Sequence, residues 1–236
     1  MKIDAAKRLV ARSVKAGHGA LSEYDSKRLL SAYGVPVTRE RLVHSAKDAW
    51  AAADRLGYPV VLKGCAHDLL HKTEAGGVVL GIDTEKQLAS GLADIQNRIS
   101  EELPEAKIDG YLIQSMEKGL AEVLVGYRLD ELVGPTVVLS AGGVLAEVYS
   151  DAAVRLAPVN RATAFEMIEE VKGLAPIRGY RGLPKGDLDA LADALIALSQ
   201  LAFIKRPKLI EAEINPLIIK PEGQGALAAD GLIFLE

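Results

Sequence analysis

The sequence predicts an α+β fold built as two lobes with a cleft between them. Hydrophobic residues make up 49% and charged residues 25% of the 236 positions, which is typical of a globular protein rather than a disordered or coiled-coil one. The length suits one large domain or two small ones. Helical and strand-like patterns are intermixed along the chain, and this mixture favours two α+β lobes.

The first half carries clear element signals. Apolar residues follow one helical face from Asp25 to Gly34, where the glycine marks the helix end. A second helix is expected over residues 45–56, with Ser45 as N-cap and Gly57 as stop. The other elements expected here are strands at 59–63, 78–82 and 111–116 and a helix at 84–99.

The second half has more strand pattern. The elements expected are strands at 121–127, 136–139 and 144–149 and helices at 161–171 and 187–203. Residues 209–214 and 217–219 are expected to pair as two strands around Asn215-Pro216, a common turn pair. We therefore expect three parts: a short helical N-terminal arm at 1–20, one subdomain at 21–120 and a second at 121–236.

Charge and cysteine content argue against several classes of protein. The net charge of −4 gives no global basic footprint for nucleic acid. No apolar stretch reaches the roughly 18 to 20 residues of a membrane-spanning helix, and the N-terminus has no signal-peptide core. A single cysteine, Cys65, cannot form an intramolecular disulfide. We expect a soluble, cytoplasmic protein that binds neither nucleic acid nor membrane.

The common nucleotide-phosphate motifs are absent from the sequence. Neither G-x-x-x-x-G-K-[ST] nor G-x-G-x-x-G occurs, and the hydrolase motif G-x-S-x-G is missing too. His67 and His71 have the i, i+4 spacing of a zinc motif, but Asp68 stands where H-E-x-x-H has glutamate. A zinc protein that uses these two histidines is therefore kept as a minor alternative.

Seven segments, in this order, resemble the ATP-grasp module of ADP-forming acyl-CoA synthetases from about Leu21 to the C-terminus. They are Tyr58-Pro-Val-Val-Leu-Lys63, His71-Lys-Thr-Glu-Ala-Gly-Gly-Val78, Asp130-x-x-x-Gly-Pro135, Gly142-Gly-Val-Leu-Ala-Glu-Val148, Asp151-x-x-x-Arg-Leu-Ala-Pro158, Gly179-Tyr-Arg-Gly182 and Glu213-Ile-Asn-Pro-Leu217. Each segment is unspecific alone, but the ordered set identifies the family. The resemblance implies the ATP-grasp fold, with a nucleotide in the cleft.

The resemblance implies a nucleotide site in the first half of the chain. Lys63 ends an apolar strand, where the pattern alone indicates only emergence into solvent; in the family such a lysine contacts the nucleotide phosphates. Gly76 and Gly77 could form an ordinary hairpin turn, but in the family this loop covers the phosphates.

A strand end and a strand glutamate extend this predicted nucleotide site. The backbone of Gln114, Ser115 and Met116 is implied to pair with the adenine edge at a hinge between lobes; a surface strand end is the plain alternative. Glu122 alternates with apolar residues, so a solvent-facing position explains it equally well. The resemblance makes it a carboxylate near the ribose or phosphates.

The C-terminal part resembles the family's Mg²⁺ site. Asn215 and Asp230 each stand in a turn-like pair, yet together they are similar to metal ligands on neighbouring strands, and Mg²⁺ prefers such oxygen donors. Glu213 lies two residues before Asn215, on the same strand face, and is expected to assist at the metal or at an incoming phosphohistidine.

Arg155 and His71 are implied to take part in phosphoryl transfer. Arg155 could be a surface arginine, but its guanidinium suits phosphate contact. A loop histidine is usually solvated. His71, however, adjoins Lys72 and the glycine loop, and the family's reaction passes a phosphoryl group through histidine. Relay through His71 and a simple phosphate or loop contact are weighed equally.

The resemblance implies the reaction acyl-CoA + ADP + phosphate ⇌ acid + CoA + ATP. The chain would be the nucleotide-binding β subunit, with ATP or ADP as substrate and Mg²⁺ as cofactor. Its partner would be an α subunit carrying the CoA-binding and phosphohistidine domains, in an α2β2 assembly, because larger members fuse these domains to the module. Two further alternatives stay open: a stand-alone ATP-grasp carboxylate ligase, and a non-catalytic nucleotide-binding regulatory subunit.

Overall fold

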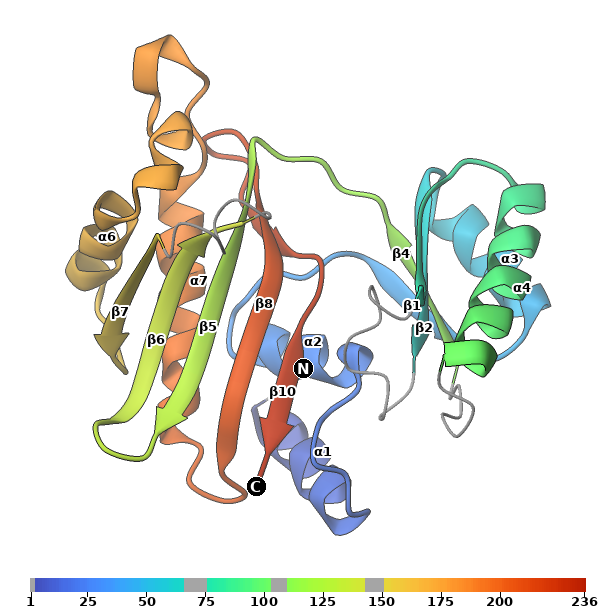
Figure 1. The fold of residues 1–236 in the computed structure, drawn as a ribbon, viewed down its shortest axis with the longest axis horizontal. Helices are drawn as coiled ribbons and strands as arrows, with labels where there is room; N and C mark the ends of the chain where they lie inside the picture. The colour runs from blue at the N-terminus through green and yellow to red at the C-terminus, as the bar shows by residue number, and fades with distance from the viewer. Residues whose placement is uncertain (1–2, 66–75, 103–109, 143–150) are drawn as a thin grey trace. The chain divides into compact units, whose positions relative to one another are not determined.

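A computed structural model describes residues 3–65, 76–102, 110–142 and 151–236 of the chain (Figure 1). The predicted strand at 144–149 therefore lies outside the described residues. The chain forms two compact units: unit 1 contains residues 1–21, 25–37 and 118–236, and unit 2 contains residues 22–24 and 38–117.

Unit 2 is built on a four-stranded antiparallel sheet. In sheet order its strands are β1 (Glu40–Val43), β4 (Gly110–Ser115), β2 (Val60–Cys65) and β3 (Val78–Ile82). The hairpin of β2 and β3 and the later return of β4 agree with the strands that the apolar runs predict. Strands β2, β3 and β4 therefore form from segments of strong β-propensity.

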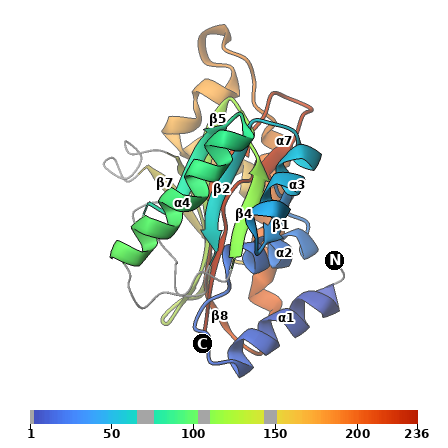
Figure 2. The same cartoon turned by 90° about the vertical axis from the view of Figure 1, so that its right-hand side faces the viewer.

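Two helices cover one face of this sheet, α3 (Ala46–Leu56) and α4 (Glu85–Glu102), which lie side by side (Figure 2). Helix α3 begins and ends as predicted: the Ser45 hydroxyl accepts a hydrogen bond from the Asp48 amide (3.2 Å), and Gly57 takes a φ of 84° after the last turn. The core between helices and sheet includes Leu62 and Ile113.

Unit 1 contains a six-stranded antiparallel sheet. Five strands run in the order β10 (Leu232–Leu235), β8 (Leu209–Ile219), β5 (Ala121–Asp130), β6 (Gly134–Ala141) and β7 (Ala152–Leu156), and the short β9 (Ala226–Ala228) also pairs with β8. The long β5 has β6 on one side and β8 on the other along most of its length. It is therefore held firmly in the middle of the sheet.

Helix α7 (Leu188–Ser199) runs behind β5 and β6 and covers one face of the sheet, with α6 (Arg161–Glu170) beside it (Figure 1). Helix α7 is buried through leucine and alanine positions that repeat at helical spacing, such as Leu191, Leu195 and Leu198. Helix α1 (Ile3–Lys15) joins the same core through Ala6, Leu9 and Val10, and α2 (Glu23–Ala32) through Leu29 and Leu30.

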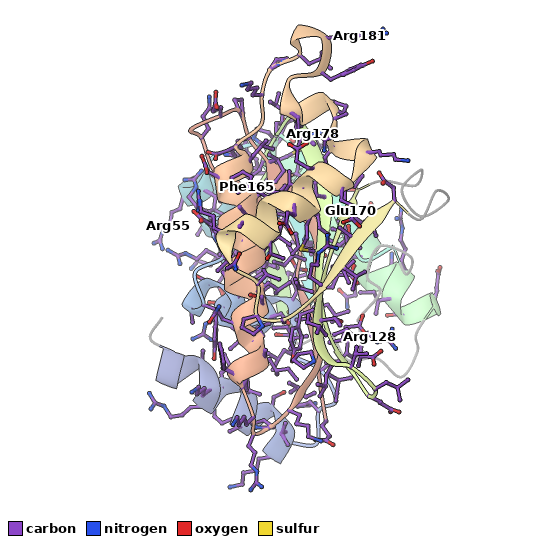
Figure 3. The ribbon with its side chains drawn as sticks, turned by 90° about the vertical axis from the view of Figure 1, so that its left-hand side faces the viewer. Arg55, Arg128, Phe165, Glu170, Arg178 and Arg181 are labelled. Carbon is purple, nitrogen blue, oxygen red and sulfur yellow. The ribbon has the colours of Figure 1, made fainter. Side chains whose placement is uncertain are left out.

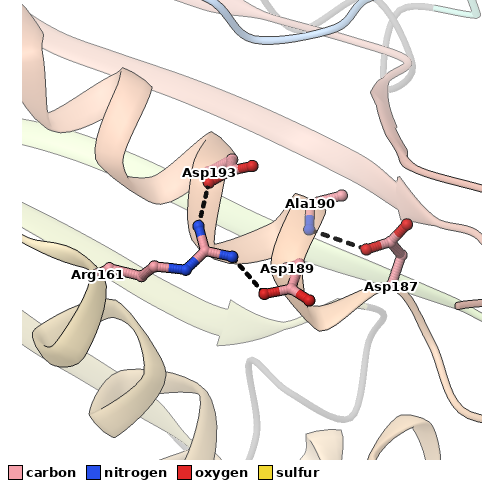
Figure 4. Close-up of polar contacts among 5 residues, drawn as sticks. All are labelled: Arg161, Asp187, Asp189, Ala190 and Asp193. Atoms are coloured by element: carbon pink, nitrogen blue, oxygen red, sulfur yellow. Dashed lines mark hydrogen bonds and ion pairs between the residues drawn. The ribbon is translucent and has the colours of Figure 1, made fainter. Parts of the chain in front are cut away.

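Arg161, the first residue of α6, connects this helix to two aspartates of α7 (Figure 4). The Arg161 guanidinium bonds to Asp189 and to Asp193 (2.6 Å), and the side chain of Asp187 caps α7 by accepting from the Ala190 amide (3.0 Å). The helix predicted at 187–203 is divided in the structure into α7 and a 3₁₀ turn that follows it, η4 (Gln200–Phe203).

Three 3₁₀ turns that the sequence pattern does not predict follow α6: η1 (Lys172–Leu174), η2 (Pro176–Arg178) and η3 (Tyr180–Gly182). Arg178, labelled in Figure 3, folds back onto α6 and donates to the carbonyls of Ile168 (2.6 Å) and Val171 (3.0 Å). It thereby adds a donor to carbonyl groups at and just beyond the end of α6, where intrahelical donors run out.

The prediction of two strands around Asn215-Pro216 is wrong, because residues 209–219 form the single strand β8. The pair sits in a β-bulge: Val123 lies opposite Leu217 and Val125 opposite Ile214, so Asn215 and Pro216 together face only Leu124. A bulge accommodates proline, which has no amide hydrogen for the ladder. The strand therefore continues through a pair that usually marks a turn.

Candidate functional site

In unit 2, Lys63 and Gln114 point to the same face of the sheet. Lys63 lies opposite Leu112 and Val78, and Gln114 opposite Val61 and Glu40. Leu62 and Ile113 alternate with them and point into the core beneath the helices. We call the face opposite α3 and α4 the Lys63 face.

The rest of the predicted adenine segment differs in orientation. Ser115 lies opposite Val60, on the helix side of the sheet, and its hydroxyl donates to the Glu117 carboxylate (2.9 Å). The backbone amide of Met116 donates to the Pro59 carbonyl (3.3 Å) just beyond the end of β4. The segment 114–116 is therefore a well-anchored strand end.

Lys63 is buried, and its Nζ lies 2.7 Å from Oε1 of Glu23. The plain alternative from the pattern alone, that this lysine only marks emergence into solvent, is therefore wrong, since only 5% of Lys63 is exposed. Glu23 is the first residue of α2, and the sequence reading passed over it. A glutamate at the start of a helix is usually exposed to solvent, and a carboxylate is favoured there. The local sequence gives no sign that this one pairs with a lysine far along the chain.

The two glycines before β3, Gly76 and Gly77, have different structural roles. Gly76 has a φ of 63°, and a side chain there would come within 2.7 Å of the Arg98 side chain, so glycine suits both the backbone and the space. The Gly77 carbonyl accepts from the Gly64 amide (2.8 Å) and extends the β2–β3 pairing. His67 and His71 lie outside the described residues.

In unit 1, Glu122 and Glu213 point away from the helix-covered core. Val123, Val125, Ala212 and Ile214, which alternate with them, are buried in that core. Their partners in register, Ile218 for Glu122 and Gly126 for Glu213, lie on the same outer face. The two carboxylates therefore share one face of the sheet.

The structure brings Asn215 and Asp230 to opposing positions. Leu217 of β8 pairs with Ala228 of β9, and Glu213 pairs with Leu232 of β10, so the residues midway between these pairs face each other. The Ala229 amide donates to the Pro216 carbonyl (3.0 Å), and this bond holds the segment between β9 and β10 against β8. Two oxygen-bearing side chains 15 positions apart in sequence thus lie opposite each other, Asn215 in β8 and Asp230 between β9 and β10.

Lys27 of α2 contacts the segment between β9 and β10 from the core. The sequence pattern did not indicate this role. Lys27 is fully buried, and its Nζ donates to the Ala229 carbonyl (3.3 Å), next to Asp230. Gly231 packs against Leu30 and Lys27, where a Cβ would lie 2.9 Å from a Leu30 methyl. The turn that carries Asp230 is therefore fixed by α2.

Arg155 does not join the other predicted site residues of unit 1. It lies opposite the buried Val137, on the helix side of the sheet, and its guanidinium bonds to Glu170 of α6 (2.6 Å) and to its neighbour's carbonyl, that of Val154 (2.9 Å). Glu170, labelled in Figure 3, raises the pKa of Arg155 through that hydrogen bond. Its structural partner is thus a carboxylate on α6.

Within the described residues, no group of three or more His, Cys, Asp or Glu side chains is arranged to hold a metal ion. A metal at Asn215 and Asp230 would therefore take most of its ligands from water or substrate, as Mg²⁺ commonly does. Among the helices of the described ranges, none is long and apolar enough to cross a membrane.

Comparison with known protein families shows which class of protein the chain belongs to. The sequence model of the ATP-grasp domain family matches residues 12–235, and the chain therefore belongs to the ATP-grasp family. Within that family it is similar over its whole length to the β subunit of acetate–CoA ligase [ADP-forming] II of Pyrococcus furiosus, with 32% identity over 236 residues and 100% of both chains covered. It is thus a homologue of the β subunits of ADP-forming acetate–CoA ligases, which are acid–thiol ligases.

Solved structures agree with this assignment and confirm the α+β ATP-grasp fold. A protein from Pyrococcus horikoshii matches with a TM-score of 0.94 and 33% identity, covering 100% of this chain and 99% of that one. Acetyl-coenzyme A synthetase 1 of Ca. Korarchaeum cryptofilum, solved with coenzyme A and Ca-AMPCP, matches with a TM-score of 0.92 and 32% identity over 98% and 100% of the two chains. Another structure of that synthetase holds coenzyme A and Mg-AMPPCP (TM-score 0.83, 29% identity, 98% and 100% covered).

Other relatives are much longer. The chain is 34% identical to acetate–CoA ligase [ADP-forming] I of Archaeoglobus fulgidus over 92% of its own length, but it spans only 31% of that protein. The remaining two-thirds of that relative have no counterpart in this sequence.

Proposed function

We propose that this chain is the nucleotide-binding β subunit of an ADP-forming acyl-CoA synthetase. With an α subunit, in an α2β2 assembly, it converts acyl-CoA, ADP and phosphate to acid, CoA and ATP. Phosphate displaces CoA to form an acyl phosphate, a histidine of the α subunit takes the phosphoryl group and releases the acid, and the phosphoryl group then passes from that histidine to ADP, directly or through a second acceptor. The last step is the one assigned to this chain. A cytoplasmic location stays a prediction.

The observation that carries the proposal is the opposing placement of Asn215 and Asp230. One amide oxygen and one carboxylate fit an Mg²⁺ ion that keeps several waters and binds nucleotide phosphates as well. Such an ion supplies charge neutralisation during phosphoryl transfer. Glu213, two residues along β8 on the outer face, is assigned to the same end of the site, where it orients a water or the incoming phosphohistidine.

Unit 2 is assigned the nucleotide's phosphates and base. The ammonium of Lys63 neutralises phosphate charge, and the backbone around Gly76 and Gly77 approaches the phosphates. The strand end formed by Gln114, Ser115 and Met116 is assigned the adenine edge, and pairing through the Met116 amide would require that amide to leave the Pro59 carbonyl. These roles are consistent with a lysine and a glutamine on one face of the sheet.

Glu122 and Arg155 have different support. Glu122 shares the outer face of the unit 1 sheet with Glu213, which agrees with a carboxylate near the ribose. Arg155 is bound to Glu170 on the helix side. A phosphate contact by Arg155 would require its guanidinium to leave that partner. The phosphate contact proposed for Arg155 therefore has less support than the role proposed for Glu122.

We further propose that His71 relays the phosphoryl group from the phosphohistidine of the α subunit to ADP. A neutral imidazole is a competent nucleophile near neutral pH, and two short transfers relax the need to align donor and nucleotide at once. The variant His71→Ala should lose acid-labile, base-stable phosphate on this subunit and most ATP synthesis, yet leave the α subunit able to accept phosphate. Near-normal ATP synthesis by the variant would contradict the relay.

Calorimetry tests the central assignment. The purified chain should bind ADP in the presence of Mg²⁺, and chelation of the metal should weaken that binding, because the ion links the phosphates to Asn215 and Asp230. Adenosine, which has no phosphates, should bind with little dependence on Mg²⁺. Failure of the chain to bind ADP with or without the metal would refute the proposal.

A further inference from the structure

The ion pair between Glu23 and Lys63 is almost fully withdrawn from water. The exposed fraction is 2% for the Glu23 side chain and 6% for that of Lys63, at an Oε1–Nζ distance of 2.7 Å. Both residues belong to unit 2. The pair therefore joins two residues of one unit: Glu23, the first residue of α2, and Lys63 on the Lys63 face of the sheet.

A buried ion pair of this kind contributes little net stability to a fold. Removing an ammonium and a carboxylate from water costs several kcal/mol for each ion, and well-packed apolar residues of similar volume often serve stability as well or better. The register neighbours of Lys63, Leu112 and Val78, are apolar, so neither supplies a counter-charge. The pair points to a requirement for the charge of Lys63 itself.

We propose that Glu23 is the positioning residue for Lys63 in nucleotide binding. Its carboxylate fixes the ammonium by a short, charge-assisted hydrogen bond before the nucleotide arrives, so that little ordering cost remains when the phosphates bind. The opening position of Glu23 in α2 suits this task, because a carboxylate is favoured at a helix N-terminus. The assignment rests on the proposed function and goes beyond it by naming a residue that does not touch the nucleotide.

A comparison of ADP with adenosine isolates the effect on the phosphates. In the Mg²⁺ calorimetry above, Lys63→Ala should weaken ADP binding and leave adenosine binding unchanged. Glu23→Gln should weaken ADP binding by about tenfold, the loss that corresponds to weakening one charge-assisted interaction. Glu23→Asp, which keeps the charge on a shorter side chain, should recover part of the ADP affinity.

A double-mutant cycle separates positioning from general stability. In the Lys63→Ala background, Glu23→Gln should change ADP affinity no further, because the residue that it positions is gone. Glu85→Gln is the matched control: Glu85 opens helix α4 in the same unit, is exposed, and should leave both affinities as in the wild type. Thermal melts confirm that each variant is folded; if Glu23→Gln is not, Glu23→Asp gives the same comparison.

Three results would overturn the inference. ADP affinity that is unchanged or higher in the Glu23 variants would show that Lys63 needs no positioning. Equal losses for ADP and adenosine would assign Glu23 a merely structural role. The same loss in the Lys63→Ala background would show that Glu23 acts through another group. Absence of ADP binding by the wild-type chain would instead refute the proposed function, and this inference with it.

Discussion

Asn215 and Asp230 owe their placement to two local features. The bulge at Asn215-Pro216 lets β8 continue past a proline, and the break between β9 and β10 places Asp230 opposite that bulge. The Lys27 ammonium holds the adjacent carbonyl of Ala229 from within the core. Backbone geometry thus sets the positions of the two proposed metal ligands, and Oδ1 of Asp230 also accepts from the Gly231 amide (2.7 Å).

Replacement of Asp230 by asparagine should weaken Mg²⁺-dependent ADP binding. The change keeps the size of the side chain and removes the negative charge, so the ion loses its single carboxylate ligand among the two residues assigned to it. Titration of Mg²⁺ at fixed ADP measures the effect, with Asp94→Asn on the exposed side of α4 as a matched control. An unchanged Mg²⁺ titration in Asp230→Asn would remove Asp230 from the site.

Asp130 should make a small, pH-dependent contribution to stability. Its partly exposed carboxylate accepts from the amides of Val133 (3.0 Å) and Leu132 (2.9 Å), and these bonds lower the pKa of the group below its ordinary value of 3.8. A lowered pKa means that the stabilisation is present above pH 3.8 and is lost as the pH falls below it.

The melting temperature of Asp130→Ala should therefore lie slightly below that of the wild type at neutral pH, and the gap should narrow in acid. Asp130→Asn keeps an acceptor for the turn and should show a smaller gap with little pH dependence. A gap that stays constant below pH 3.8 would contradict the assigned role of the carboxylate.

At the scale of elements, α7 supports the sheet that carries the proposed metal ligands. It packs against β5, β6 and β8, and its apolar face is deeply buried. The outer face of the same sheet carries Glu122 and Glu213. One face of each strand therefore provides stability while the other presents the proposed site.

Truncation of Leu195 in α7 to alanine should destabilise the chain by about 2–5 kcal/mol, because it leaves a cavity in a fully buried position. Denaturant unfolding measures the change. Leu132→Ala makes the same chemical change at a residue that is 95% exposed and should alter stability by no more than about 0.5 kcal/mol. A loss below about 1 kcal/mol at Leu195 would mean that α7 packs loosely.

At the scale of the whole molecule, the chain matches an entire β subunit but only 31% of a longer single-chain relative. We therefore predict that the purified chain alone does not convert acyl-CoA, ADP and phosphate to ATP, and that activity requires an α subunit. A coupled ATP assay with and without the co-expressed partner measures this. Robust turnover by the chain alone would favour the stand-alone carboxylate ligase.

The sequence by itself determined most elements, since their signals are local: the apolar run of β2, the cap and stop of α3, and the leucine repeat of α7. The ordered motifs also identified the family, because the segments that carry chemistry stay recognisable as short strings of residues. The family resemblance implied that Asn215 and Asp230 act together, although only the sheet register sets them opposite each other.

Only the tertiary structure decided what depends on distant partners. It merged two predicted strands into β8, moved Arg155 to the helix side of its sheet, and buried Lys63 against Glu23. Each outcome is set by a contact with another element: for β8 a neighbouring strand that accepts a bulge, for Arg155 a carboxylate on helix α6, and for Lys63 a helix that begins 40 residues earlier. Local patterns record the chemistry of a side chain, but its burial and its partner are properties of the folded chain.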